Sequence, residues 1–331
     1  MDAANYIPAL KYGAKIYPQN LIDVSIPVED GNIWFVDGDK TTGGGGKTWE
    51  DAFSESDFDG TLSSLSSSIQ AGDVFYIANR TNAQTDTDPV SYTTNLTIDV
   101  PQVSLIGVSR GRTQGGLPQF KVGATTTQAI IRVRAPGVQI ANLGFNGAGA
   151  TGGGVRFDDD GGTTYSSFGG SILDCHFKNC KGTTATDALT GGAIMLSGAP
   201  WQMRFAGNRF YKNVGDICLL DTSTSVPQDV VIEYNSFGDS GASTDCNIQL
   251  SGGSGPGVGL LIRGNDFGTQ PALSSGATAL FMDLAGADGG VVAGNYFGTD
   301  GTLGATGNAA VVPTTVFLSG NYDEGGLIAR T

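Results

Sequence analysis

The stretches RGNDFGT (263–269) and AGNYFGT (293–299) are nearly identical and begin 30 residues apart. Related segments share the pattern apolar-x-x-x-Asn-x-Phe. The recurring phenylalanines are Phe145, Phe177, Phe210, Phe237, Phe267 and Phe297, and the recurring asparagines are Asn208, Asn235, Asn265, Asn295 and Asn321. A period of about 30 residues, written in short pieces separated by Gly and Asn, is typical of a solenoid.

The repeated pieces have the two-residue period of β-strands. In LLIRGNDF (260–267), Leu260 and Ile262 share one face, whereas Leu261 and Arg263 share the other. Helical repeats of the same length would place apolar residues at i, i+3, i+4 and i+7 and would avoid so much glycine. A β-sandwich is the alternative fold, but it gives no reason for Asn-x-Phe to recur. The pattern therefore predicts an all-β, single-stranded parallel β-helix with one coil per repeat.

The Asn and the Phe of the repeat have separate physical roles. Asn enters the left-handed backbone region more readily than other non-glycine residues, so we expect each recurring Asn to form a tight bend. Stacked Asn side chains would also hydrogen-bond from coil to coil. The Phe two residues later returns to the inward face, and the phenylalanines would stack as an aromatic column.

A second set of strands lies between these segments, in GVRFDD (154–159), AIMLSG (193–198), DICLLDT (216–222), NIQLSG (247–252) and ALFMDL (279–284). We expect the pairs Val155 and Phe157, Ile194 and Leu196, and Ile248 and Leu250 to face inward.

The segment that precedes the repeats contains NIWFVDGDKTTGGGGKTWEDAFSE (32–55), AGDVFYI (71–77) and QVSLIG (102–107). Between the first two, Leu62, Leu65 and Ile69 have helical spacing and predict a short helix that closes the first coil. These stretches resemble the opening of the pectate-lyase-like family of right-handed parallel β-helices, and the likeness covers residues 32–325. It implies a right-handed β-helix but leaves the activity open, because that superfamily contains lyases, hydrolases, phage tailspikes and adhesins.

Residues 1–31 lie outside this likeness and are predicted to form an extended N-terminal attachment arm. The β-helix domain would follow at 32–331, with its capping strand and helix at 32–80 and its coils at 91–325. The arm residues expected to bind a partner are Tyr6, Ile7, Pro8, Leu10, Tyr12, Ile16 and Tyr17. An arm followed directly by a solenoid is similar to the layout of phage virion proteins. An arm folded back on its own solenoid is the alternative.

Composition excludes several classes of function. The formal net charge is −14, which repels nucleic acid phosphates. No run of about 18 apolar residues predicts a membrane span, and the N-terminus lacks the basic and apolar regions of a signal peptide. The spacing of the four cysteines, Cys175, Cys180, Cys218 and Cys246, suits neither zinc nor a disulfide framework, so buried free thiols are expected.

Candidate catalytic and metal-binding residues are sparse. Asp158, Asp159 and Asp160 form an acidic turn before glycine, and no cofactor is expected except a calcium ion at Asp158 and Asp160. Other strand-end carboxylates, Asp221 and Asp283, would lie two coils from their neighbours, at about 10 Å, which is too far for one ion. Asp160 and Asp221 aside, the basic residues are scattered: Arg132, Arg134, Arg156, Arg204, Arg209 and Arg263.

The only histidine, His176, is expected to point outward, with Asp174 on the same face as its one candidate carboxylate partner. No lyase or hydrolase constellation can be transferred from the resemblance to these residues, so enzymatic activity is left open and no catalytic residue is assigned.

The sequence thus predicts a structural or adhesive virion protein of a tailed bacteriophage, a capsid decoration, head fibre or tailspike-like protein. Its partners would be other virion proteins and cell-surface polysaccharide, without nucleic acid or membrane. The predicted location is the virion, with an extracellular location as the alternative. Met195, Leu261 and Phe281 are expected to be exposed and to line a homotrimer interface. The alternative function is a polysaccharide lyase or glycoside hydrolase.

Overall fold

A computed structural model describes most of the solenoid. The described residues are 31–58, 69–80, 92–108, 116–123, 125, 127–147, 153–159, 166–180, 192–198, 200–220, 227–238, 246–251, 259–268, 281–298, 303–304 and 310–328. The predicted arm residues, from Tyr6 to Tyr17, lie outside them, as do Leu62, Leu65, Asp160 and Asp221.

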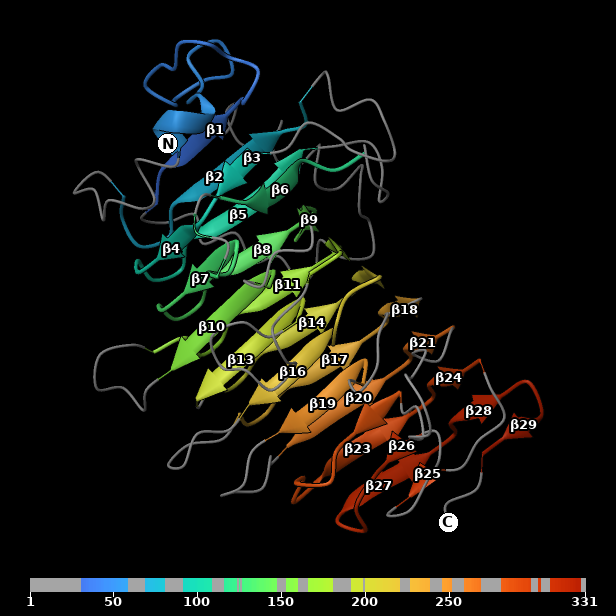
Figure 1. Cartoon of the computed structure of the whole chain (residues 1–331). Coiled ribbons are helices and arrows are strands. Elements are labelled where there is room, and N and C mark those ends of the chain that lie inside the picture. Colours follow the sequence, from blue (N-terminus) through green and yellow to red (C-terminus); the bar gives the residue numbers. More distant parts are fainter. Residues whose placement is uncertain are drawn as a thin grey trace, which may run out of the picture.

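The described strands form three sheets that run the length of the molecule (Figure 1). Sheet A contains β1 (Ile33–Val36), β2 (Val74–Ala78), β5 (Ser104–Val108), β8 (Gln139–Ala141), β11 (Ser171–Leu173), β14 (Arg204–Ala206), β17 (Val231–Glu233), β20 (Leu260–Arg263), β23 (Gly290–Ala293) and β27 (Val316–Ser319). Sheet B contains β3 (Tyr92–Thr94), β6 (Gln119–Val122), β9 (Gly144–Asn146), β12 (His176–Lys178), β15 (Arg209–Tyr211), β18 (Ser236–Gly238), β21 (Asp266–Phe267), β24 (Tyr296–Phe297), β28 (Tyr322–Asp323) and β29 (Gly326–Leu327). Sheet C contains β4 (Leu96–Ile98), β7 (Ile131–Val133), β10 (Val155–Asp159), β13 (Ile194–Gly198), β16 (Ile217–Leu220), β19 (Ile248–Ser251), β22 (Met282–Asp283), β26 (Ala310–Val311) and β25 (Leu303–Gly304).

One circuit of the chain passes through sheets A, B and C in turn. Strands β8, β9 and β10 complete one coil, and β11 then pairs in parallel with β8 to begin the next. Every described strand pair is parallel except the terminal pair of β28 with β29. The chain is therefore a right-handed parallel β-helix, as predicted, and each Asn-x-Phe segment supplies two strands that belong to different sheets.

The predicted aromatic column is present. Successive rings from Phe145 to Phe297 stack with centroids 4.7–5.3 Å apart and planes within 12° of each other. The column continues beyond the predicted set through Phe120, 6.0 Å from Phe145, and Tyr92, 5.2 Å from Phe120. These contacts arise because the register pairs Phe177 with Phe210 and so on along sheet B.

The asparagine ladder is also present, and its hydrogen bonds follow one rule. Asn235 Nδ2 donates to Phe205 O at 3.0 Å and to Asn265 Oδ1 at 3.0 Å. Asn235 Oδ1 accepts from the backbone N of Asn208 at 2.9 Å and from its Nδ2 at 3.0 Å. The same pattern recurs down to Asn321, and all five asparagines are buried. The polar groups inside each corner therefore satisfy one another across coils.

The expectation that these asparagines adopt the left-handed conformation is wrong. The residue immediately before each one does so instead: Gly207 (φ 69°), Tyr234 (φ 55°), Gly264 (φ 62°), Gly294 (φ 62°) and Gly320 (φ 61°). The bend is placed one residue earlier because the Asn must direct its side chain into the corner, where both of its polar atoms are bonded. Glycine precedes Asn in most coils because it enters this region without a Cβ clash.

The first coil is closed by a helical segment that the structure describes at 55–58, earlier than the predicted helix. Phe58 is fully buried and its ring lies 5.8 Å from Phe75 and 6.2 Å from Phe120, so it covers the end of the aromatic column. Ile69, from the predicted helix, is buried as well.

Side-chain orientation on sheet C agrees only in part with expectation. Val155, Phe157, Ile194, Leu196, Ile248 and Leu250 are all buried in the core, as predicted. Met195 and Phe281, predicted to be exposed, are also buried. Phe281 packs against Phe267 and Phe297 because β22 begins at Met282, which leaves Phe281 in the preceding turn, facing inward. Leu261 is half-buried on the outer face of sheet A.

Candidate functional site

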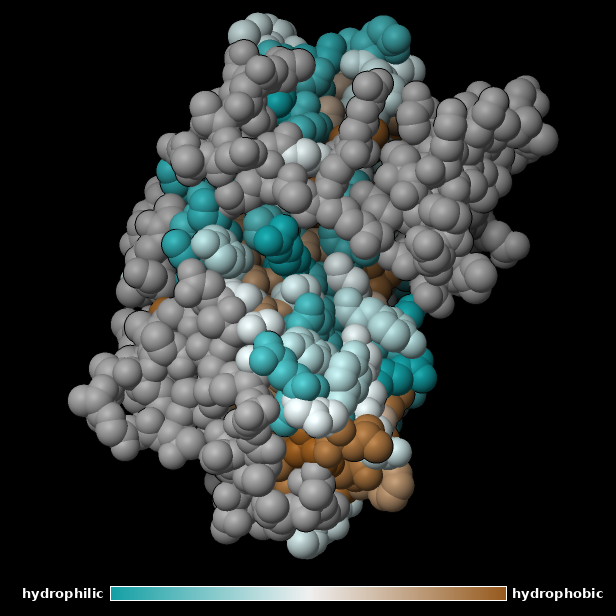
Figure 2. Space-filling model, turned by 90° about the vertical axis from the view of Figure 1, so that its right-hand side faces the viewer, coloured by the Kyte–Doolittle hydropathy of each residue, from teal (hydrophilic) through white to brown (hydrophobic). Residues whose placement is uncertain are grey.

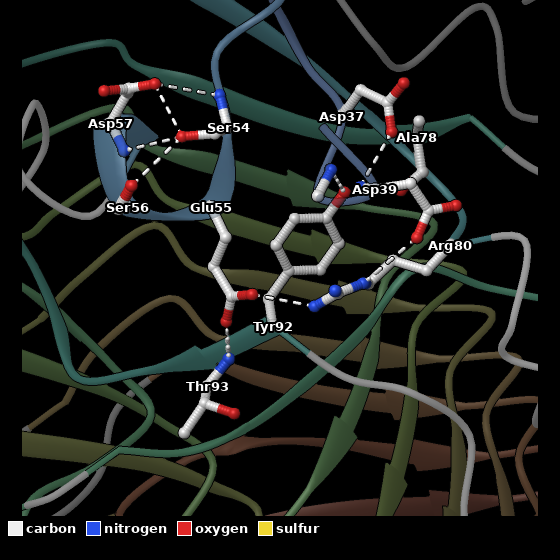
Figure 3. A network of polar contacts seen from close by, with 11 residues as sticks. Asp37, Asp39, Ser54, Glu55, Ser56, Asp57, Ala78, Arg80, Tyr92 and Thr93 are labelled. Carbon is white, nitrogen blue, oxygen red and sulfur yellow. Dashed lines mark hydrogen bonds and ion pairs between the residues drawn. The ribbon is translucent and has the colours of Figure 1, made fainter. Parts of the chain in front are cut away.

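The N-terminal end of the solenoid carries a polar network around Tyr92 (Figure 3). The Tyr92 hydroxyl donates to Ala78 O at 2.8 Å and accepts from the backbone N of Gly38 at 2.9 Å. Burial raises the pKa of Tyr92 well above its usual value, so the hydroxyl stays protonated and continues to donate. Tyr92 thus joins the turn after β1, the end of β2 and the start of β3.

Arg80 extends this network toward the capping helix. Its Nη1 donates to Glu55 Oε2 at 2.7 Å, and its Nε lies 3.4 Å from Asp39 Oδ1. Glu55 Oε1 accepts from the backbone N of Thr93 at 2.6 Å (Figure 3). The carboxylate at the helix start therefore holds β3 and Arg80 together, and this arrangement is a structural latch between the cap and the first coil.

Asp158, the predicted calcium ligand in β10, lies between two arginines. One of its carboxylate oxygens accepts from Arg132 Nε of β7 and the other from Arg156 Nε of its own strand. Arg156 Nη2 also lies 3.3 Å from Ser197 Oγ. Two guanidinium groups neutralise this buried carboxylate, which leaves it little negative charge to offer a cation. With Asp160 outside the described residues, the calcium site stays a prediction.

The remaining strand-end carboxylates do not share one column. Asp158 aligns with Ser197, and Ser197 aligns with Leu220, which in turn aligns with Ser251. Asp283 aligns instead with Gln249, one position earlier along the strand. The expected placement of Asp283 in line with Asp158 is therefore wrong, because the strand offset differs by one residue and a one-residue offset moves a side chain to the other face.

On sheet A, the buried carboxylate of Glu233 links three coils. Glu233 Oε1 accepts from Arg204 Nη2 at 2.6 Å, and Oε2 accepts from Arg263 Nη2 at 2.7 Å. The carboxylate raises the pKa of Arg263 further, and the Arg263 guanidinium also lies over the ring of Tyr234. Arginine and glutamate alternate along β14, β17 and β20, so this group stabilises the stack of coils.

His176 is buried, and the expectation that it points to solvent is wrong. Its side chain begins on the outer face of sheet B, because Phe177 points inward, but only 5% of the residue is exposed. Neither Nδ1 nor Nε2 has a hydrogen-bond partner, so the predicted pair with Asp174 is not formed. Asp174 occupies the left-handed corner position (φ 51°), which directs it away from the strand direction.

The neighbours of His176 set its charge. Burial, then Arg209, then Lys178 lower the pKa of His176 to about 4. At neutral pH the imidazole is therefore uncharged and presents one donor and one acceptor. Gln119, on the same outward column, is likewise buried with an unpaired Oε1.

Sequence reasoning missed the proximity of Arg209 to His176, although the signal was available. The two residues are 33 positions apart, as are Phe177 and Phe210, and the register pairs them directly. The residue before each Phe therefore forms a column of its own. Reading this column along with the aromatic one would have brought Gln119, Gly144, His176 and Arg209 together.

All four cysteines are buried with free thiols, as predicted. Burial raises the pKa of Cys175 and Cys180, so both stay protonated and unreactive. Within the described ranges, no group of three or more His, Cys, Asp or Glu side chains could hold a metal ion. In the same part of the chain, no helix is long and apolar enough to cross a bilayer.

No protein-family model matches the sequence, and a search of curated proteins found no match. Among solved structures, the chain is similar to PfbA, a surface adhesin of Streptococcus pneumoniae. The two share 12% sequence identity with a TM-score of 0.36, over 77% of this chain and 80% of PfbA. At this level of similarity the match carries no argument about function, and the β-helix rests on the strand pairing described above.

Proposed function

We propose that the chain is a structural and adhesive protein of a tailed-phage particle, which holds its solenoid away from the particle as a rigid support with a binding face. The observation that carries this proposal is the outer face of sheet B, where Arg209, Lys121 and the unpaired His176 gather on a chain with a net charge of −14. Cationic and unpaired polar groups on one face of an acidic molecule favour contact with a ligand there.

The solenoid core supports the same function. Asparagines buried in the corners are bonded coil to coil, and the aromatic rings are in contact from Tyr92 to Phe297. Such a core holds outward residues at fixed spacing of about 4.8 Å per coil, which suits a surface that must keep its shape under load. In this proposal the arm, residues 1–31, attaches the chain to a capsid or tail partner.

Association with particles tests this function. The full chain, fluorescently labelled, is sedimented with phage particles that lack their own copy, and compared with a triple variant, Tyr6→Ala, Tyr12→Ala and Tyr17→Ala. We expect the parent chain to sediment with the particles and the variant to stay in solution. Labelled parent protein that remains in the supernatant with every particle preparation would refute the attachment.

A further inference from the structure

The column of outward residues on sheet B combines groups that are buried without partners. It runs from Gln119 through Gly144 to His176 and Arg209, one residue per coil, in direct register. Figure 1 places β18, β21, β24 and β28 of this sheet along the right-hand side of the molecule, the side that Figure 2 faces. There, hydrophilic residues occupy the middle of the face, and apolar residues gather toward the C-terminal end (Figure 2).

Gly144 lets Gln119 approach His176. A Cβ on Gly144 would lie 2.0 Å from Gln119 Nε2 and 2.8 Å from its side-chain carbonyl carbon, so the amide lies directly over this glycine. His176 is on the next coil, about 4.8 Å further along the sheet. Gln119 Oε1 and both ring nitrogens of His176 are buried and unpaired. Each such atom costs about 1–3 kcal/mol unless a partner satisfies it.

Cations surround these neutral groups. Arg209 pairs with His176 in register on its far side and is exposed, and Lys121 lies two residues beyond Gln119 on the same outward face. Lys178 occupies the corresponding position beyond His176. The nearest carboxylates on the described residues are Glu55, which is bonded to Arg80, and Asp266, two strands beyond Arg209. The field at this point is positive, opposite in sign to the whole chain.

This combination of groups indicates the chemistry of a ligand. A bare inorganic anion would use only donors and would leave Gln119 Oε1 unpaired, whereas a sugar hydroxyl can donate to it. A neutral imidazole can donate to one hydroxyl or ring oxygen and accept from another. Arg209 presents a planar fork that matches a carboxylate. Tyr211, two residues beyond Arg209 on the same face, adds a partly exposed ring on which a sugar ring can pack.

We propose that Gln119, His176 and Arg209, assisted by Lys121, form a binding site for a sugar acid, a hydroxylated ring that carries a carboxylate. The carboxylate contacts Arg209 and Lys121, and the hydroxyls contact the imidazole and the Gln119 amide. This inference rests on the proposed adhesive function, since it names the chemical class that the binding face recognises.

The single histidine makes the site directly observable. A long-range ¹H–¹⁵N spectrum of the full chain contains one imidazole, that of His176. The probes are sodium glucuronate, glucose and sodium sulfate at matched concentration and ionic strength. We expect glucuronate to move the imidazole signals in a saturable way, and glucose and sulfate to leave them near their starting positions. The absence of a shift with glucuronate, or an equal shift with sulfate, would overturn the assignment.

Two variants locate the carboxylate. Arg209→Gln removes the exposed guanidinium without touching the core, and we expect roughly tenfold weaker glucuronate binding, since a charge-assisted bidentate contact is lost. Lys40→Gln makes the same change of charge at the far end of the solenoid and should leave the affinity unchanged. Equal affinity in the parent and in Arg209→Gln would refute the role of Arg209.

The outcomes separate this inference from the function on which it rests. Sedimentation with particles depends on the arm and requires no sugar, whereas the imidazole shifts require no particle. Particle association without glucuronate shifts retains the function and refutes the site. Glucuronate shifts without particle association retain the site and refute the virion role.

Discussion

At the scale of single residues, this protein is organised by pairs of positions with opposite requirements. The residue before each recurring Asn must adopt the left-handed backbone region, and the Asn itself must place two polar atoms in a buried corner. Gly207, Gly264 and Gly294 meet the first requirement without strain, whereas Tyr234 meets it with a side chain of which 62% is exposed. A single substitution therefore has very different consequences at adjacent positions.

Replacing Asn235 by Ala should destabilise the protein by about 3 kcal/mol. The change removes four hydrogen bonds and leaves the backbone N of Asn208 and the carbonyl of Phe205 buried without partners. Urea denaturation followed by circular dichroism measures the effect. Ser236→Ala, at the next and exposed residue, is the control and should change stability by less than about 0.5 kcal/mol. Similar losses for both variants would contradict the role of the ladder.

His176 should make stability depend on pH in a defined window. Its pKa is lowered to about 4 in the folded state, against about 6.5 for an unperturbed histidine, so the unfolded chain binds the additional proton. The stabilisation is complete above pH 6.5 and is lost as the pH falls toward 4, by roughly 2 kcal/mol between pH 7 and pH 5. Denaturation at a series of pH values measures this slope. In His176→Gln the slope over this window should flatten, and an unchanged slope would assign it to other groups.

At the scale of elements, the two strands of each repeat segment are short, and their order comes from contacts between coils. Strands of two to five residues gain little stability alone, and a parallel pair gains less than an antiparallel pair. Links that span several elements therefore matter more than strand propensity. Glu233 joins β14, β17 and β20, and Tyr92 joins β3 to the end of β2 and to the turn after β1.

Replacing Tyr92 by Phe should cost about 2 kcal/mol. The ring and its contact with Phe120 remain, but Gly38 N and Ala78 O each lose a buried hydrogen-bond partner. Thermal unfolding measures the loss, and hydrogen exchange should locate it in β1, β2 and β3. Tyr322→Phe is the matched control, because Tyr322 lies near the opposite end of sheet B with 44% of its surface exposed. Equal melting temperatures for Tyr92→Phe and the parent protein would refute the latch.

At the scale of the whole molecule, the solenoid is a one-dimensional stack in which each coil contacts its neighbours. Sheet B continues from β3 to β28, and the aromatic column follows it for most of that length. In such a stack, stability is approximately a sum of coil and interface terms, so the ends open more readily than the centre. The N-terminal end is covered by Phe58, whereas Leu327 and Phe317 at the other end are largely exposed.

Hydrogen exchange should therefore show a gradient along the molecule. We expect the slowest backbone exchange in β12, β15 and β18, where ring stacking and the asparagine ladder continue on both sides. Exchange should be faster in β27 and β28, near the uncovered end. Mass spectrometry of labelled peptides measures both regions in one experiment, and uniform protection from β12 to β28 would contradict a stack of separable coils.

The sequence by itself determined the fold and the two ladders, because a buried Asn-x-Phe repeated at each circuit leaves a pattern of spacing that no other part of the chain can mask. It also placed the inward residues of sheet C, where the two-residue alternation is clear. Only the tertiary structure decided the outward groups: the burial of His176, the arginines around Asp158 and the approach of Gln119 over Gly144. These depend on which side chains meet across coils, and a loop of variable length between strands hides that register from the linear sequence.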